Sequence, residues 1–206
     1  MLRFLNLPIL FPVLMGLGLL ILHPESRKTR NLYLMTAVLI TSALSFAAIG
    51  VTYVQGSDAL ACIMVRFNDV FSISLRIDGA SMVFGTIVST LWPIITVYAI
   101  DYMSHEGSEN RFFSFWLMAY GVVLGVAYSE DFLSLYLFYE LLTLSTLPLV
   151  MHAMDSKARY AGRVYLTYSM CGAALGFLAM VMLLEHGGTV FLLGGSLVCP
   201  AGKEDT

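Results

Sequence analysis

The sequence predicts an all-α integral membrane protein with about six transmembrane helices and a short external β-strand or hairpin before the third helix. Three observations predict this fold class: the composition, a series of long apolar segments, and a one-sided distribution of basic residues. The 206 residues are 58% hydrophobic and only 12% charged. Soluble domains are about 45–50% apolar and about 25% charged, so the composition excludes an ordinary soluble domain.

Six segments are long and apolar enough to cross a bilayer, which requires about 20 mostly apolar residues. They cover roughly residues 3–22, 32–54, 79–101, 112–129, 131–153 and 163–185. Only four residues, 128–131, separate the fourth segment from the fifth, so these two must be antiparallel neighbours. The first segment is predicted to be a retained helix rather than a cleaved secretory signal, because it lacks an A-x-A site and its positive charges follow it.

Basic residues collect on one side of the predicted topology. With the N-terminus outside, the inner loops hold most of the 11 lysines and arginines, namely Arg27, Lys28, Arg30, Arg111, Lys157, Arg159 and Arg163. The positive-inside rule therefore predicts a multi-pass protein of an inner or plasma (cell) membrane with its N-terminus outside. The net charge is −3 and basic residues are not interleaved with aromatics, so nothing indicates nucleic-acid binding.

The external loop before the third segment carries an alternating pattern. Apolar residues alternate with polar ones along Phe71, Ser72, Ile73, Ser74, Leu75, Arg76, Ile77 and Asp78. A period of two is typical of a half-buried strand, so we expect a short strand or hairpin on the outer surface of the bundle. Asp78 and Gly79 then turn the chain into the third segment.

Two segments carry glycines spaced four residues apart. These are Gly121 and Gly125 in the fourth segment, and Gly172 and Gly176 in the sixth. Small residues at this spacing let membrane helices approach closely. They predict a packed bundle but no particular activity.

The three cysteines, Cys62, Cys171 and Cys199, fit no metal-binding or redox spacing. A disulfide between Cys62 and Cys199 requires both residues outside the membrane and the right geometry. We see no dinucleotide fingerprint after a strand and no histidine pair for haem. The sequence therefore predicts no metal, no cofactor and no redox site of its own, and whether the chain is part of an enzyme stays open.

Glu140 is the one charge in the middle of the fifth segment. It lies about nine residues into the segment, roughly 13 Å deep and near the midplane of a core about 30 Å thick. An acidic residue at that depth costs about 2.5–3.5 kcal/mol and usually marks an ion or proton pathway. The alternative is a protonated glutamate that only bonds a neighbouring helix. We predict that Glu140 carries protons.

Other polar groups could serve the same pathway. Tyr136 and Thr143 lie on the same helical face as Glu140 and form a candidate polar path. Pro148 removes a backbone hydrogen bond and predicts a kink two turns further on. His152 and Lys157, near the inner surface, are candidates for a proton entrance, although interfacial and positive-inside roles explain them equally well.

The segment DFLSLYLFYELLTLSTLPLVMHA (131–153), followed by a short basic loop and AGRVYLTYSMCGAALGF, resembles the antiporter-like subunits of respiratory complex I. It also resembles the related subunits of Mrp-type cation/proton antiporters and of membrane-bound hydrogenases. Upstream, FSISLRIDGAS and IDYM extend the resemblance to about residues 65–190. In this family, the glutamate that Glu140 matches pairs with a lysine on a broken seventh helix, and the two alternate between protonation and charge pairing.

The resemblance also implies an organisation. Residues 1–110 would form an N-terminal three-helix segment with its external loop, 111–190 the first three helices of an antiporter-like repeat, and 191–206 a polar tail. The family has about fourteen helices, so the resemblance implies a truncated or split antiporter-like subunit. No residue here matches the family's lysine.

Three hypotheses follow. The first is a proton-translocating subunit, or a piece of one, within a complex I-like NADH:quinone oxidoreductase or membrane-bound hydrogenase, with other membrane subunits as partners. The second is a component of an Mrp-type sodium/proton antiporter, which would move Na⁺ as well as protons. The third is a membrane scaffold subunit that transports nothing.

Overall fold

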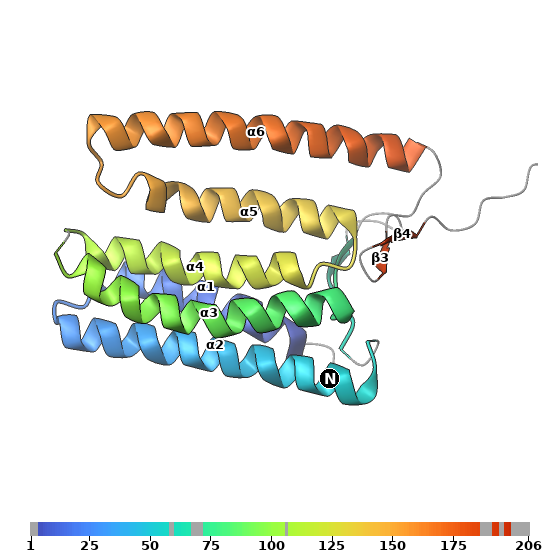
Figure 1. The fold of residues 1–206 in the computed structure, drawn as a ribbon, viewed down its shortest axis with the longest axis horizontal. Coiled ribbons are helices and arrows are strands. Elements are labelled where there is room, and N and C mark those ends of the chain that lie inside the picture. The colour runs from blue at the N-terminus through green and yellow to red at the C-terminus, as the bar shows by residue number, and fades with distance from the viewer. Residues whose placement is uncertain are drawn as a thin grey trace, which may run out of the picture.

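The computed structural model describes residues 4–57, 60–66, 72–105, 107–185, 191–193 and 196–198. Within these residues lie six helices long and apolar enough to cross a membrane, which confirms the predicted fold class. They are α1 (Leu7–Leu22, after a 3-10 turn at Phe4–Asn6), α2 (Arg27–Gln55), α3 (Gly79–Met103), α4 (Glu109–Ala127), α5 (Phe132–Val150) and α6 (Ser156–Glu185). The helices lie roughly parallel to one another along the long axis of the molecule (Figure 1).

Two helices begin earlier than the sequence predicts. The structure starts α2 at Arg27 and α6 at Ser156, whereas the predicted segments begin near residues 32 and 163. At 29 residues α2 extends roughly 44 Å, well beyond a hydrocarbon core of about 30 Å. Most of the basic residues predicted for inner loops therefore lie near the starts of helices, where Arg27, Lys157 and Arg159 are exposed and Arg30 is buried.

The centre of the bundle is α4. It packs mainly against α1 and α5 and also contacts α2 and α3, whereas the chief helical neighbour of α6 is α5. Close approach depends on two glycines of α4. A Cβ on Gly121 would lie less than 3.0 Å from the Ile9 carbonyl oxygen, and one on Gly125 would lie equally close to the Phe138 ring. The predicted packing role of this pair is confirmed.

The second glycine pair behaves differently. A Cβ on Gly172 or Gly176 would meet nothing within 4 Å. These two glycines therefore bring no helix close to α6 among the described residues.

Hydroxyl groups fill part of the core between α2, α3 and α4. Ser42 shares a hydrogen bond of 2.8 Å with Tyr120, Ser45 shares one of 2.6 Å with Tyr128, and Ser89 donates to Ser45 at 2.7 Å. Both tyrosines are fully buried. Because buried polar groups are stable only when hydrogen-bonded, these contacts fix the three helices against one another.

The external loop forms a β-hairpin, as predicted. Strand β1 (Cys62–Arg66) pairs antiparallel with β2 (Ser72–Leu75), with a register shift between Ile63 and Val65. Asp78 caps α3 by accepting a hydrogen bond from the Ser81 amide at 2.8 Å. The predicted turn into the third helix is therefore confirmed.

The burial of β2 departs from simple alternation, because Ser74 and Leu75 are both buried. The cause is that β2 lies against the turn between α4 and α5. The Glu130 amide donates to the Ser74 carbonyl at 3.0 Å, and the Arg76 amide donates to the Tyr128 carbonyl at 2.9 Å. The turn thus pairs with an edge of β2, where Leu75 and Ser129 form an antiparallel bridge.

Part of the predicted polar tail forms a second hairpin, with β3 (Phe191–Leu193) antiparallel to β4 (Ser196–Val198). Cys62 is a buried thiol whose sulfur donates to Asn6 Oδ1 at 3.3 Å. Cys199 lies outside the described residues, so the structure does not test whether a disulfide joins Cys62 to Cys199.

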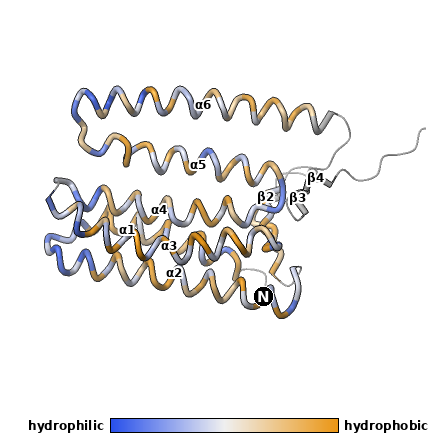
Figure 2. Tube along the Cα trace, viewed as in Figure 1, coloured by the Kyte–Doolittle hydropathy of each residue, from blue (hydrophilic) through white to orange (hydrophobic). Residues whose placement is uncertain are grey.

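The two ends of the bundle differ in character. The connections between α1 and α2, α3 and α4, and α5 and α6 all lie at the end opposite the β1–β2 hairpin (Figure 1). Hydrophilic segments gather at this end (Figure 2). We call it the basic end, after Arg27, Lys28, Arg30, Arg111, Lys157, Arg159 and Arg163.

Candidate functional site

The start of α5 is anchored on the β-hairpin. Asp131 caps the helix by accepting a hydrogen bond from the Ser134 amide at 2.6 Å, which is the favoured role of aspartate at a helix N-terminus. The Ser134 hydroxyl in turn accepts from the Ser74 amide of β2 at 2.8 Å. These contacts fix the register from which α5 carries Glu140 into the bundle.

Glu140 lies at the middle of α5, which runs from Phe132 to Val150. Its side chain is half-buried, and its Oε1 atom is buried with no hydrogen-bond partner. A buried carboxylate oxygen without a partner is costly, and far more so when ionised. No group among the described residues bonds this oxygen.

Next to Glu140, hydroxyl groups join α5 to α6. Thr143 shares a hydrogen bond of 2.8 Å with Ser169, and Thr146 shares one of 2.7 Å with Tyr165. The two pairs are about one helical turn apart and step from Glu140 toward the basic end. We call Thr143, Thr146, Tyr165 and Ser169 the hydroxyl seam.

A groove opens beside the hydroxyl seam. Its volume is about 410 Å³, and it is lined by Tyr139, Leu142, Thr143, Tyr165, Tyr168 and Ser169. Tyr139 is the residue before Glu140. Five of the six lining residues carry a hydroxyl group, and water molecules in a groove of this size can bond to such groups.

Tyr136 and Thr143, the predicted polar path, make contacts other than the expected ones. The Tyr136 ring packs against Phe177 of α6, with centroids 5.9 Å apart. Thr143 bonds Ser169 and donates to the Tyr139 carbonyl at 3.3 Å. Neither side chain bonds Glu140 within the described residues, so a path through them requires water or motion.

Pro148 lies in the last turn of α5, two residues before the helix ends at Val150. Its ring removes one backbone donor and crowds the carbonyl of Leu144. After Met151, the chain turns through Met154, which has a left-handed φ of 54°. The disruption that proline imposes therefore falls at the end of α5 rather than beside Glu140.

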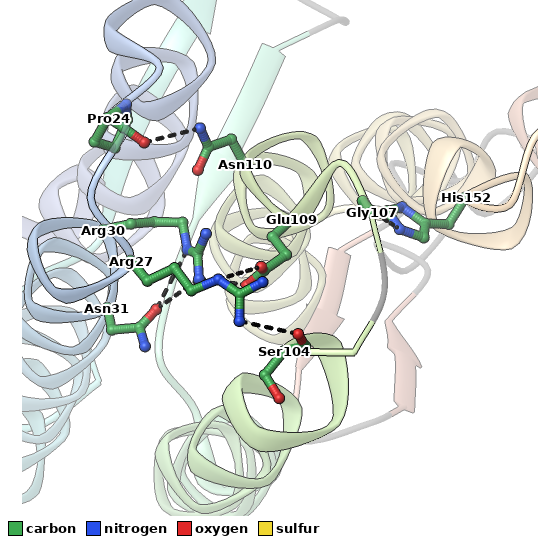
Figure 3. A network of polar contacts seen from close by, with 9 residues as sticks. All are labelled: Pro24, Arg27, Arg30, Asn31, Ser104, Gly107, Glu109, Asn110 and His152. Carbon is green, nitrogen blue, oxygen red and sulfur yellow. Dashed lines mark hydrogen bonds and ion pairs between the residues drawn. The ribbon is translucent and has the colours of Figure 1, made fainter.

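His152 links two connections at the basic end. Its Nε2 atom lies 2.9 Å from the Gly107 carbonyl (Figure 3), and its own carbonyl accepts from Arg111 at 2.6 Å. Its Nδ1 atom is buried without a partner. Lys157 is exposed in the first turn of α6. Within the described residues, no hydrogen bond or ion pair joins either side chain to Glu140.

An ionic cluster at the basic end was not predicted. Arg30 and Glu109 form a buried ion pair, and Arg27 Nε lies 3.2 Å from Glu109 Oε1. Arg27 also donates to the Ser104 carbonyl at 3.0 Å (Figure 3). Since 79 residues separate the buried partners, local sequence patterns carry no signal for this pair.

The α6 hydroxyl groups of Tyr165 and Ser169 were also not predicted from the sequence, although their spacing in the sequence is a usable signal. Tyr165 and Ser169 are four residues apart and so share one helical face, as Thr143 and Thr146 do at a spacing of three. The same helical spacing that grouped Tyr136 with Glu140 would have grouped them. In the part of the chain that the structure describes, no cluster of three or more His, Cys, Asp or Glu could hold a metal ion.

Comparisons with known proteins agree with the sequence resemblance. The family model "NADH-Ubiquinone oxidoreductase (complex I), chain 5 N-terminus" matches residues 66–113. The chain is 28% identical over 148 residues to "NAD(P)H-quinone oxidoreductase subunit 5, chloroplastic" of Ipomoea purpurea, covering 69% of this chain and 21% of that protein. The resemblance to the antiporter-like subunits is confirmed.

Another relative is "Na(+)/H(+) antiporter subunit A1" of Staphylococcus haemolyticus, at 23% identity over 158 residues, or 77% of this chain and 20% of that protein. A chain in the structure of the membrane-bound sulfane sulfur reductase, an archaeal respiratory membrane complex, has the same fold. The TM-score is 0.76 at 16% identity, over 91% of this chain and 38% of that one. The chain thus spans about a fifth of the length of these curated relatives.

Proposed function

We propose that this chain acts as a proton-translocating antiporter-like membrane subunit, or a segment of one, with Glu140 as the carboxylate that carries protons. Its setting would be a complex I-like NADH:quinone oxidoreductase or a membrane-bound hydrogenase complex, with other membrane subunits as partners. One observation carries the proposal: Glu140 lies at the middle of α5, and its Oε1 atom is buried without a partner. The similarity to complex I and antiporter subunits supports it.

The chemistry follows from the cost of a charge in the membrane. An ionised carboxylate at the bilayer centre costs about 2.5–3.5 kcal/mol, so a Glu140 that carries protons would be ionised mainly while a cation is near. A positive charge within about 4–6 Å favours the ionised form. Approach and withdrawal of such a charge would make Glu140 release and take up a proton. The family resemblance implies a lysine on a seventh helix as that charge.

The hydroxyl seam is the proposed route between Glu140 and the basic end. A hydroxyl both donates and accepts hydrogen bonds, so protons can pass along Thr143, Ser169, Thr146 and Tyr165 through water in the adjoining groove. His152 and Lys157 would serve at the entrance. Tyr136, one turn toward the hairpin end, would serve the opposite half of the route. We assign the basic end to the inner side and the N-terminus to the outer side.

Substitution of Glu140 tests the proposal. Glu140→Gln in the assembled complex should lower proton uptake into inverted membrane vesicles at least about tenfold, because glutamine cannot exchange a proton. Glu140→Asp keeps the carboxylate and should retain part of the activity. Glu25→Gln, a matched change of an exposed carboxylate, should leave uptake unchanged. Full proton uptake by assembled Glu140→Gln would refute the proposal and favour a membrane scaffold.

The second candidate is a component of an Mrp-type antiporter, favoured by the similarity to sodium/proton antiporter subunit A1. The two functions differ in the driving force. Vesicles that move protons in response to an imposed Na⁺ gradient, without any electron donor, would support the antiporter. Proton uptake that depends on an electron donor and is indifferent to Na⁺ would support the redox-driven complex.

A further inference from the structure

A second groove lies at the basic end, between the end of α5 and the start of α6. Its volume is about 390 Å³, and Met151, Ser156, Arg159 and Arg163 line it. The two arginines are four residues apart on one face of α6 and are both exposed. This groove is separate from Glu140 and from the groove beside the hydroxyl seam.

These two arginines differ from the others whose side chains the structure describes. Arg27 and Arg30 pair with Glu109, Arg76 pairs with Glu130, and Arg111 donates to the His152 carbonyl. Neither Arg159 nor Arg163 has a hydrogen bond or ion pair from its side chain among the described residues. The groove thus presents two guanidinium groups without a protein anion to neutralise them.

Asp155, the nearest carboxylate in sequence, serves another purpose. Its Oδ1 atom accepts a hydrogen bond from the Ala158 amide at 2.6 Å, and its carbonyl accepts from the Arg159 amide at 3.0 Å. It therefore caps the first turn of α6. The anion that the groove would accept must come from outside these residues.

The floor of the groove is apolar and tightly packed. A Cβ on Gly162 would lie less than 3.0 Å from Met151 Cγ and equally close to its sulfur. Met151 thus rests directly on the backbone of α6 and closes the groove on the α5 side. The two exposed arginines therefore lie beside an apolar wall that Met151 forms.

The depth of the groove matches the headgroup region of a bilayer. Arg163 is the last charged residue before an uninterrupted uncharged stretch from Val164 to Leu184. On the same helical face follow Met170 and Phe177, which are 60% and 48% exposed. A phosphate in the groove would therefore have apolar side chains directly below it, where acyl chains would lie.

We propose that this groove binds the headgroup of an anionic phospholipid. The phosphodiester accepts paired hydrogen bonds from Arg159 and Arg163, whose planar guanidinium groups suit phosphate oxygens. Its acyl chains lie along Met170 and Phe177. Basic pockets between transmembrane helices on the inner side are suited to such headgroups. An acidic protein segment would satisfy the arginines but not the exposed apolar face below them.

The test is lipid retention by the full chain, or the complex that contains it, extracted in detergent and analysed by native mass spectrometry. Phosphatidylglycerol and phosphatidylcholine are added in turn as probes. The wild type should retain phosphatidylglycerol selectively. Arg159→Gln with Arg163→Gln should weaken this binding roughly thirtyfold, or about fivefold for each cation. Glycerol phosphate, which lacks acyl chains, should compete poorly.

Lys28→Gln is the matched control, because it removes an exposed positive charge from the same end of the bundle, in the first turn of α2, without lining the groove. It should leave selective retention intact. Equal loss in this control, equal retention of both lipids, or unchanged retention in the double variant would each overturn the proposal. A crosslink from Arg163→Cys to another protein subunit in the intact complex would assign the groove to a partner and overturn it too. Unaltered elution and helical content verify the fold of each variant.

Discussion

The Arg30 guanidinium and the Glu109 carboxylate form an ion pair that joins the first turn of α2 to the first turn of α4. Their side chains are only 6% and 7% exposed. Arg30 also lies over the Phe113 ring, 5.5 Å from its centroid, and donates to Asn31. Desolvation makes such a pair a weak source of net stability, but it makes the loss of one partner expensive.

Glu109→Gln should therefore destabilise the protein by about 3–5 kcal/mol, because it leaves Arg30 charged and buried. Thermal unfolding in detergent, followed by tryptophan fluorescence, measures the change. Arg27→Gln is the control: this partner is 62% exposed, and exposed ion pairs contribute at most about 1 kcal/mol. The double change Arg30→Met with Glu109→Leu should restore most of the lost stability. Equal effects of Glu109→Gln and Arg27→Gln would contradict the assignment of a buried pair.

A second prediction concerns helix packing. Gly125→Ala should cost about 1–3 kcal/mol, because its Cβ would overlap the Phe138 ring and push α5 away from α4. Gly172→Ala is matched in chemistry but meets nothing within 4 Å. It should be neutral or stabilise by up to about 1 kcal/mol, the helix propensity gain of alanine over glycine. Thermal unfolding of the two variants side by side checks the difference. A larger loss from Gly172→Ala than from Gly125→Ala would contradict the described surroundings of both glycines, the open one on α6 and the tightly packed one on α4.

A third prediction concerns the hydroxyl seam. A double-mutant cycle with Thr143→Val and Ser169→Ala should give a coupling energy of about 0.6 kcal/mol, the average for hydrogen bonds between membrane helices. Both single variants should also slow proton uptake if the seam carries protons. Coupling without any effect on uptake would leave the seam as a structural contact and remove it from the proposed route.

A fourth prediction is a pH dependence that comes from Cys62. Burial, with a smaller contribution from the charge of Glu130, raises the pKa of this thiol above its ordinary value of 9.0. As pH rises past about 9, the unfolded chain loses the thiol proton first. Deprotonation lowers the free energy of the unfolded state relative to the folded state, so the free energy of unfolding falls. This contribution is fully present below the ordinary pKa and disappears as pH passes the folded-state value.

Replacing Cys62 with alanine should therefore flatten the alkaline decline in unfolding temperature between about pH 8 and 11. Cys171→Ala, a change at an exposed cysteine, should leave the decline as it is. Identical alkaline profiles for the wild type and Cys62→Ala would show that another group causes the decline.

Much of the fold was predictable because each element carries a local signal. Apolar length marks the helices, the alternation from Phe71 to Asp78 marks β2, and Asp78 before Gly79 marks the start of α3. The first turns of α2 and α6 were missed because hydropathy marks the apolar core, whereas a helix continues into the charged interface. The pairing of β1 with β2 and their contact with the α4–α5 turn depend on distant residues.

In the candidate site too, features with a local sequence signal were predictable, and features that depend on contacts between helices were not. Glu140 was predictable because a charge in an apolar helix is visible in the sequence alone. Its lack of a partner, and the bonds of Thr143 and Thr146 to α6, depend on which face of α6 meets α5. The Arg30–Glu109 pair joins residues far apart in sequence, so no local pattern indicates it.

The most direct test of the central claim is the protonation state of Glu140 during turnover. Infrared difference spectra of the assembled complex, recorded with and without the driving reaction, follow the carbonyl band of protonated carboxylic acids. If Glu140 carries protons, one such band should change on turnover, shift in Glu140→Asp and vanish in Glu140→Gln together with proton uptake. An unchanged spectrum and full uptake in Glu140→Gln would contradict the account.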